Sequence, residues 1–148
     1  MASNPEVIIA RISAMGSAAD PDYRQVLRCG RHEMLADERP ARGGADAGPM
    51  PFEYLLAGLA ACTSITLRMY AKRKGWDIGT VSVSLALRRG KDGVKVERRV
   101  GLSAPLTAEE RSRLLEICEK TPVTLAVRSG VPIHTTLSPA QPGPAPQA

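Results

Sequence analysis

The pattern of apolar and polar positions is most distinctive over residues 52–67, where Glu53 is the only charged residue. A helix over this stretch would be apolar on nearly all sides, and in a soluble protein such a helix is covered by other elements. Pro51 suits the first turn of a helix, cations at positions 72–74 suit the last turn, and Gly75 supplies a cap. The sequence therefore predicts a central, covered helix between these two ends.

Alternating positions before this helix predict a small antiparallel meander. The expected strands cover residues 7–14, 23–29 and 32–36, with an Asp-Pro-Asp turn at residues 20–22. Residues 37–51 are rich in glycine and proline, so we expect a long loop that delivers the chain into the central helix.

The pattern after the central helix predicts a β-hairpin and then a second helix. Residues 81–87 alternate between apolar and polar side chains, and a turn at residues 91–93 leads to a partner strand over residues 94–102. A capping box at residues 107–110 opens the second helix, and Pro122 interrupts it.

The end of the chain is expected to hold a short helical piece over residues 123–127 and a last strand over residues 131–137. The tail, residues 138–148, is rich in proline and cannot bury apolar area, so we expect it to be disordered. This order of elements indicates an α+β fold with antiparallel sheets. At 148 residues the chain fits a single domain, which we place at residues 1–137.

Composition and charge argue against a nucleic-acid partner. Aromatic residues make up 3% of the chain, too few for a surface that stacks on bases. The net charge of +5 would permit weak association with polyanions, but the lysines and arginines are scattered along the chain. We therefore interpret the charge as solvated surface.

The N-terminus and the cysteines favour a cytoplasmic location. The first residues lack the basic segment and apolar core of a secretory signal. The apolar stretch around Cys62 contains Glu53 and is short of the roughly 20 residues that cross a bilayer, so we expect no membrane span. Cys29, Cys62 and Cys118 are odd in number, which favours reduced thiols over a disulfide framework.

Four side chains are candidates for chemistry, at Cys62, Cys29, His32 and His134. Cys62 is either inert packing or a guarded reactive centre, and residue statistics alone favour packing. Cys29 and His32 have the spacing of half a metal site, but a structural zinc needs four ligands and no matching pair is apparent. We expect no metal, and we interpret His134 as a surface or interface residue.

A set of short segments carries a family resemblance. They are residues 37–38 with Pro40, 43–44, 48–56, 59–63, 70–76, 113–117 and 122–123. Together they resemble the OsmC/Ohr family, named for osmotically inducible and organic hydroperoxide resistance proteins. The resemblance implies an intertwined homodimer in which two β-sheets wrap a pair of central helices, with a thiol peroxidase site at the dimer interface. It also implies an external thiol or dithiol reductant and no bound cofactor.

By residue-for-residue match, the resemblance makes Cys62 the residue that attacks the peroxide. A thiolate is needed, so a nearby positive group must lower the thiol pKa from about 8.5. The helix N-terminus is several turns away and contributes little. The family supplies an arginine from its N-terminal sheet, and we rank Arg24 and Arg28 first, with Arg31 and Arg39 as further candidates.

Two positions depart from the family pattern. The hydroperoxide-resistance branch has a glutamate directly after the proline, where this chain has Phe52; Glu53 follows about 100° around the helix and need not orient the arginine. The usual resolving cysteine directly precedes the Pro-Val pair, where this chain has Thr121. Cys118 stands three residues earlier and either resolves the oxidised thiol or is packing.

The leading interpretation is a thiol-dependent peroxidase that reduces organic hydroperoxides through a sulfenic acid at Cys62, in defence against oxidative stress. The apolar surroundings suit a fatty or aryl hydroperoxide better than hydrogen peroxide. The alternative is a catalytically weakened, dimeric small-molecule binding or sensing protein of the same fold, because Phe52 and Thr121 replace catalytic partners.

Overall fold

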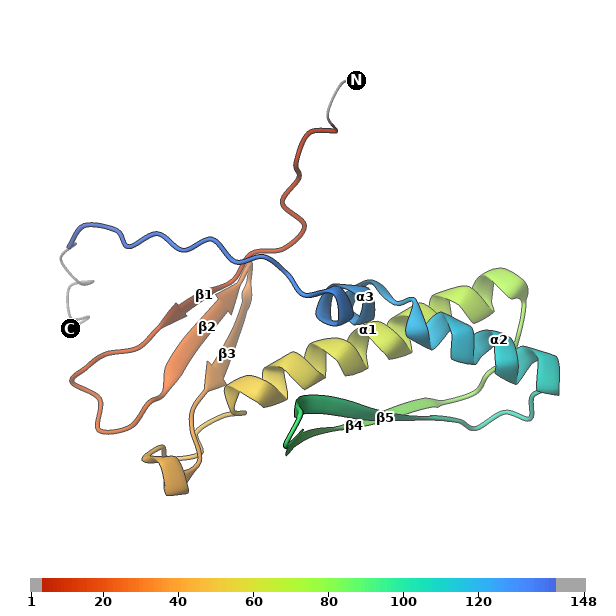
Figure 1. The fold of residues 1–148 in the computed structure, drawn as a ribbon, viewed down its shortest axis with the longest axis horizontal. Helices are drawn as coiled ribbons and strands as arrows, with labels where there is room; N and C mark the ends of the chain where they lie inside the picture. The colour runs from red at the N-terminus through yellow and green to blue at the C-terminus, as the bar shows by residue number, and fades with distance from the viewer. Residues whose placement is uncertain (1–3, 141–148) are drawn as a thin grey trace.

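The computed structural model describes residues 4–140, which form two antiparallel sheets and three α-helices (Figure 1). The first sheet consists of β1 (Ser13–Met15), β2 (Gln25–Cys29) and β3 (His32–Ala36), in that order. A loop with one turn of 3-10 helix (Pro40–Arg42) then leads to the long helix α1 (Pro51–Lys74). The fold is α+β, as the sequence predicts.

Helix α1 begins and ends where the sequence predicts. At its start, the Glu53 carboxylate accepts a hydrogen bond of 2.9 Å from the backbone N–H of Met50. At its end, Gly75 has a φ of 70° and donates its N–H to carbonyls of the last turn. A positive φ is easily adopted by glycine, which is why the helix stops there.

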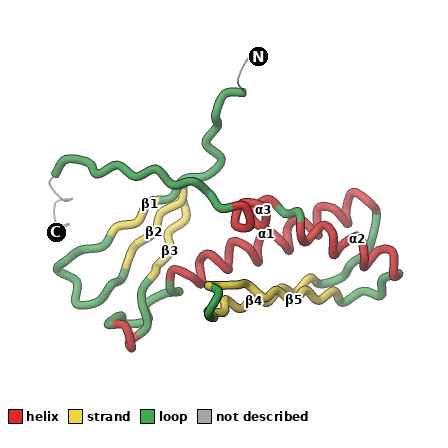
Figure 2. Tube along the Cα trace, viewed as in Figure 1, coloured by secondary structure: helices red, strands yellow, loops and turns green. Residues whose placement is uncertain are grey.

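The predicted hairpin follows α1 and packs against it. Strands β4 (Val81–Gly90) and β5 (Gly93–Leu102) pair antiparallel across the predicted turn. Helix α2 (Ala108–Glu119) opens with the predicted capping box, and α3 (Pro122–Ser129) follows almost directly. Figure 2 shows α1 running along the hairpin with α2 and α3 beside it.

The hydrophobic core lies in this second part of the chain. Its buried members are Leu67, Tyr70 and Ala71 of α1, Ile78, and Leu114 and Cys118 of α2. The β1–β2–β3 sheet lies beyond the N-terminal end of α1 (Figure 1). The Tyr54 hydroxyl, which donates to the Leu35 carbonyl, ties β3 to the first turn of α1.

Two predicted strands differ in the structure. Residues 7–12 are exposed and outside the sheet, because Ser13 pairs with Arg28 and any earlier residue would face the end of β2 and its turn at Gly30. Residues 131–137 are exposed and pair with no strand among residues 4–140. Both segments have strand-like sequences, and neither has a neighbouring strand within the described part of the chain. The predicted disordered tail is described only at residues 138–140, and the rest of it lies outside the described residues.

Helix α1 is covered on one side only. Leu59, Thr63 and Leu67 lie on its buried stripe, whereas Ile65 is 53% exposed and Met69 is 60% exposed. The prediction of an all-round cover therefore does not hold within a single chain. By length and composition alone, the 24 residues of α1 could cross a bilayer, a test that the core helix of a soluble protein also passes. The expectation of no membrane span rests on the shorter apolar stretch around Cys62, not on the whole helix.

Candidate active site

Cys62 lies in the middle of α1 and is half-buried. Its Sγ atom is 3.9 Å from the hydroxyl of Thr66, one turn further along the helix. Cys62 follows Leu55 by seven residues and Leu59 by three, and seven residues make almost two full turns. These three residues therefore share one face of α1, while Thr63, the next residue after Cys62, is fully buried.

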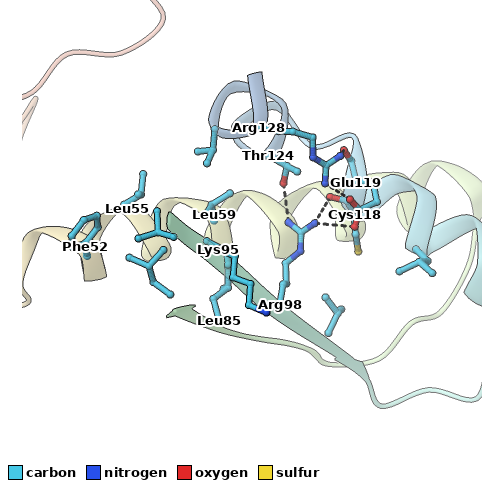
Figure 3. Close-up of a pocket in the computed structure, with 16 residues that line it drawn as sticks. Phe52, Leu55, Leu59, Leu85, Lys95, Arg98, Cys118, Glu119, Thr124 and Arg128 are labelled. Carbon is cyan, nitrogen blue, oxygen red and sulfur yellow. Dashed lines mark hydrogen bonds and ion pairs between the residues drawn. The ribbon is translucent and has the colours of Figure 1, made fainter. Parts of the chain in front are cut away.

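A cavity of about 750 Å³ lies between the first half of α1, the β4–β5 hairpin and the α2–α3 corner. Cys118 is among the residues that line it, and Cys62 is not. Its wall is apolar along Phe52, Leu55 and Leu59, and the charged side chains of Arg98 and Arg128 line it near the α2–α3 corner (Figure 3). The volume falls within the range of about 300–1,000 Å³ that is usual for small-molecule sites. The cavity could therefore hold a molecule with an apolar body.

Arg98 is the most heavily bonded side chain of this cavity. Its Nη1 atom donates to the hydroxyls of Thr63 at 3.0 Å and Thr124 at 2.8 Å. Its Nη2 atom donates to the carbonyl of Cys118 at 2.8 Å and lies 3.5 Å from the Glu119 carboxylate (Figure 3). The side chain is 13% exposed, and a guanidinium is held out of water only where such bonds replace its hydration.

The sequence reasoning missed Arg98, although the strand pattern contains a signal for it. On β5 the residues of one face are apolar at positions 94, 96, 100 and 102, and Arg98 is the only charged residue among them. It stands opposite Leu85 on the face that looks toward α1. A charged residue on the apolar face of a one-sided strand breaks the period-two pattern and marks a position with a specific partner.

Cys118 and Thr121 both lie under the α2–α3 corner. Cys118 is 4% exposed, and its burial raises the pKa of the thiol, an effect that the nearby Arg98 charge partly offsets. Thr121 is fully buried and caps α3, where its hydroxyl donates to the Thr124 hydroxyl at 2.6 Å. The position of the family's usual resolving cysteine is thus occupied by a buried helix cap.

Glu53 is paired with Arg39, an arginine of the loop before α1. The Arg39 guanidinium contacts the Glu53 carboxylate and lies 3.6 Å from the carboxylate of Asp46. The loop itself is organised by Asp37, a buried side chain. Its carboxylate accepts three backbone N–H groups, from Glu38 at 2.8 Å, Ala45 at 3.0 Å and Ala47 at 3.2 Å. Burial works to raise the pKa of Asp37, but the backbone hydrogen bonds together outweigh it and lower that pKa.

The two arginines that rank first in the sequence do not meet Cys62 within one chain. Arg28 is on β2 and pairs with Glu33 at 3.0 Å on the exposed side of the sheet. Arg24 precedes β2 and is also exposed. Glu53 lies nine residues before Cys62, which corresponds to about 13.5 Å along the helix axis. The structure of a single chain therefore groups Glu53 with Arg39, and leaves Arg24, Arg28 and Cys62 apart.

Metal ligands do not cluster in the described part of the chain. Cys29 and His32 are partners across the β2–β3 pair. Residues 4–140 bring no three histidine, cysteine, aspartate or glutamate side chains into a group that could hold a metal ion. His134 is exposed in the segment after α3.

The family model for OsmC-like proteins matches residues 43–136, which include the whole of α1, the hairpin and the α2–α3 corner. The chain belongs to the OsmC-like protein family. No curated protein matches it. Family membership gives the chain a place among proteins related to peroxide and oxidative stress.

Solved structures of OsmC-like proteins share the fold. An OsmC-like protein from Mycoplasma pneumoniae has a TM-score of 0.69 and 19% identity, with 80% of this chain and 86% of that chain covered. An organic hydroperoxide resistance protein OsmC from Legionella pneumophila has a TM-score of 0.60 and 20% identity, over 84% and 92% of the two chains. The organic hydroperoxide resistance protein OhrB of Bacillus subtilis has a TM-score of 0.57 and 22% identity, over 82% and 91%.

Proposed function

We propose that this OsmC-like protein is a thiol-dependent peroxidase that reduces organic hydroperoxides with Cys62 as the nucleophile. The observation that carries the proposal is the position of the Cys62 thiol. It is half-buried in the middle of an apolar helix, three residues after Leu59 and directly before Thr63. Leu59 lines the cavity of about 750 Å³, and Thr63 is bonded to Arg98, which also lines it, so Cys62 lies next to the cavity although it is not one of the lining residues. The apolar part of the cavity wall, at Phe52, Leu55 and Leu59, suits a fatty or aryl hydroperoxide better than hydrogen peroxide, which has no apolar part to bury.

The proposed reaction has two steps. The Cys62 thiolate attacks the terminal oxygen of the hydroperoxide, the O–O bond breaks, and the organic part leaves as an alcohol after it takes up a proton. The cysteine is thereby oxidised to a sulfenic acid. Two external thiol groups then reduce the sulfenic acid, which returns Cys62 to a thiol and yields a disulfide and water. No bound cofactor takes part.

We further propose that the working form is a homodimer and that Arg39 is the activating arginine. Large apolar side chains of α1 are exposed, and strand-like segments at residues 7–12 and 131–137 are unpaired, which favours a second copy as their cover. Arg39 is held by Glu53 far along the helix from Cys62 of the same chain. A second copy that places its own loop beside Cys62 would complete the site.

The alternative is a binding or sensing protein that keeps the fold and turns over slowly. One observation favours it. The position that the resemblance gives to the resolving cysteine holds Thr121, whose buried hydroxyl is hydrogen-bonded to Thr124. In that case the cavity would bind a small apolar molecule and Cys62 would be a packed thiol.

The test is consumption of cumene hydroperoxide with dithiothreitol as reductant, in wild type and in Cys62→Ser. Serine is nearly isosteric but far less nucleophilic, so we expect the variant to lose turnover while its circular dichroism and oligomeric state stay those of wild type. Cys118→Ser is the matched control, and we expect it to keep turnover because an external thiol does the reduction. Equal activity in wild type and Cys62→Ser would overturn the proposed peroxidase function and leave the binding or sensing function as the remaining candidate.

A further inference from the structure

The side chain of Arg98 connects three elements around the two cysteines. From β5 it reaches Thr63 on α1, the residue directly after Cys62, and Thr124 on α3. Its other nitrogen holds the carbonyl of Cys118, one of the last carbonyls of α2, which have no partner inside the helix. The clamp, by which we mean Arg98 with Thr63, Thr124 and the Cys118 carbonyl, fixes the end of α2 relative to the Cys62 turn of α1.

The two thiols are not joined under this clamp. Cys62 and Cys118 are both free, and the Cys62 sulfur contacts the Thr66 hydroxyl. A disulfide requires the two Cβ atoms to approach within about 3.5–4.5 Å in a narrow range of dihedral angles. One guanidinium bonds both Thr63, the neighbour of Cys62, and the Cys118 carbonyl, so the two cysteines flank the same side chain. The hydrogen bond to the Cys118 carbonyl opposes a movement of the last turn of α2 toward Cys62.

We infer that Arg98 is a positioning residue that keeps Cys118 from resolving oxidised Cys62, and so reserves the sulfenic acid for an external thiol. The inference rests on the proposed peroxide reaction at Cys62. The step that the clamp opposes is attack of the Cys118 thiol on the Cys62 sulfenic acid. That step forms one S–S bond, breaks the S–OH bond, and releases water made from the hydroxyl and the thiol proton.

Arg98→Met tests the clamp directly. Wild type and variant are treated with one equivalent of cumene hydroperoxide, trapped with a sulfenic-acid reagent, and digested for mass spectrometry. In wild type we expect the sulfenic adduct on Cys62 and little Cys62–Cys118 bridge. In Arg98→Met we expect a several-fold rise of the bridge within single chains, with a matching loss of the trapped adduct.

A matched arginine separates the clamp from general loosening of α2. Arg113 also links α2 to α1, through a hydrogen bond of 2.9 Å to the Tyr70 hydroxyl. Its other bond, of 2.6 Å, is to the Glu116 carboxylate of its own helix and not to the Cys118 carbonyl that Arg98 holds. Arg113→Met should therefore leave the bridge at the wild-type level. Thr63→Val removes the α1 side of the clamp while Arg98 keeps its other partners, so it should raise the bridge even if Arg98→Met does not fold.

The outcomes separate this inference from the proposed function. Absence of any trapped adduct on wild-type Cys62 would overturn the peroxide reaction itself. A trapped adduct in wild type, with no extra bridge in a folded Arg98→Met or in Thr63→Val, would overturn the clamp alone. An equal rise in Arg113→Met would also overturn it, and so would a bridge that is already quantitative in wild type.

Discussion

Arg39 forms an ion pair with Glu53, and this pair fastens the loop at residues 37–50 to the first turn of α1. The same carboxylate caps the helix through the Met50 N–H. One glutamate thus both begins the helix and fixes the direction of an arginine whose side chain is 49% exposed. A guanidinium held in this way is preorganised to stabilise a thiolate that approaches it.

Arg39→Met and Glu53→Gln should both slow the reaction of Cys62 with cumene hydroperoxide, and Arg39→Met should slow it more. Arg39→Met removes the positive charge itself. Glu53→Gln keeps the charge on Arg39 but removes the carboxylate that forms an ion pair with it. Stopped-flow measurement of the peroxide step gives the rates. If Arg24→Met or Arg28→Met slows the step and Arg39→Met does not, the activating arginine is one of those that rank first in the sequence.

Cys62 should react with iodoacetamide much faster than Cys118 in the native protein at neutral pH. Cys118 is 4% exposed, and burial raises the pKa of its thiol, so little thiolate is present and access is poor. Peptide mass spectrometry of samples quenched over time gives the two rates. In urea the two rates should converge, and faster labelling of Cys118 in the native state would contradict its position in the core.

Excess cumene hydroperoxide without reductant should overoxidise Cys62 to the sulfinic acid. Thr121 cannot form a disulfide, so no cysteine directly before the Pro-Val pair removes the sulfenic acid before a second peroxide attacks. Intact-mass measurement against peroxide concentration follows the added oxygens. Saturation at a disulfide within the chain, with no sulfinic product, would show that an internal thiol resolves Cys62.

Asp37→Asn should destabilise the protein at neutral pH and have less effect in acid. The backbone hydrogen bonds to the Asp37 carboxylate outweigh the effect of burial and lower its pKa below the ordinary value of 3.8. The ionised Asp37 carboxylate therefore contributes fully to the free energy of unfolding above about pH 4. That contribution is lost as the pH falls through the lowered pKa that Asp37 has in the folded state. Urea unfolding of wild type and variant at several pH values gives the difference in their free energies of unfolding. If that difference grows toward low pH, the proposed role of the ionised carboxylate is wrong.

The elements that sequence predicts correctly are those whose signals are local. Gly75 and the capping box at Thr107 each act within a few residues, and both fall where the sequence places them. The strands expected at residues 7–14 and 131–137 depend instead on a neighbouring strand. Among residues 4–140, only residues 13 and 14 of these two segments pair with one.

The candidate site follows the same division. Cys62 can be located from the apolar run around it and from the family resemblance. Arg98 and Thr63 are 35 positions apart, and Arg39 and Glu53 are 14 apart. The pattern of apolar and polar positions does not reveal pairs so far apart in the sequence. The exception is Arg98 itself, a charged residue on the otherwise apolar face of β5.

The exposed apolar side of α1 affects how the stability of this protein must be measured. Met69 is 60% exposed and Ile65 is 53% exposed, on a helix whose other side carries the core. When association buries such side chains, part of the folding free energy comes from mass action, and the unfolding midpoint rises with protein concentration. For the proposed homodimer, a melting temperature therefore has a meaning only together with the concentration at which it was recorded.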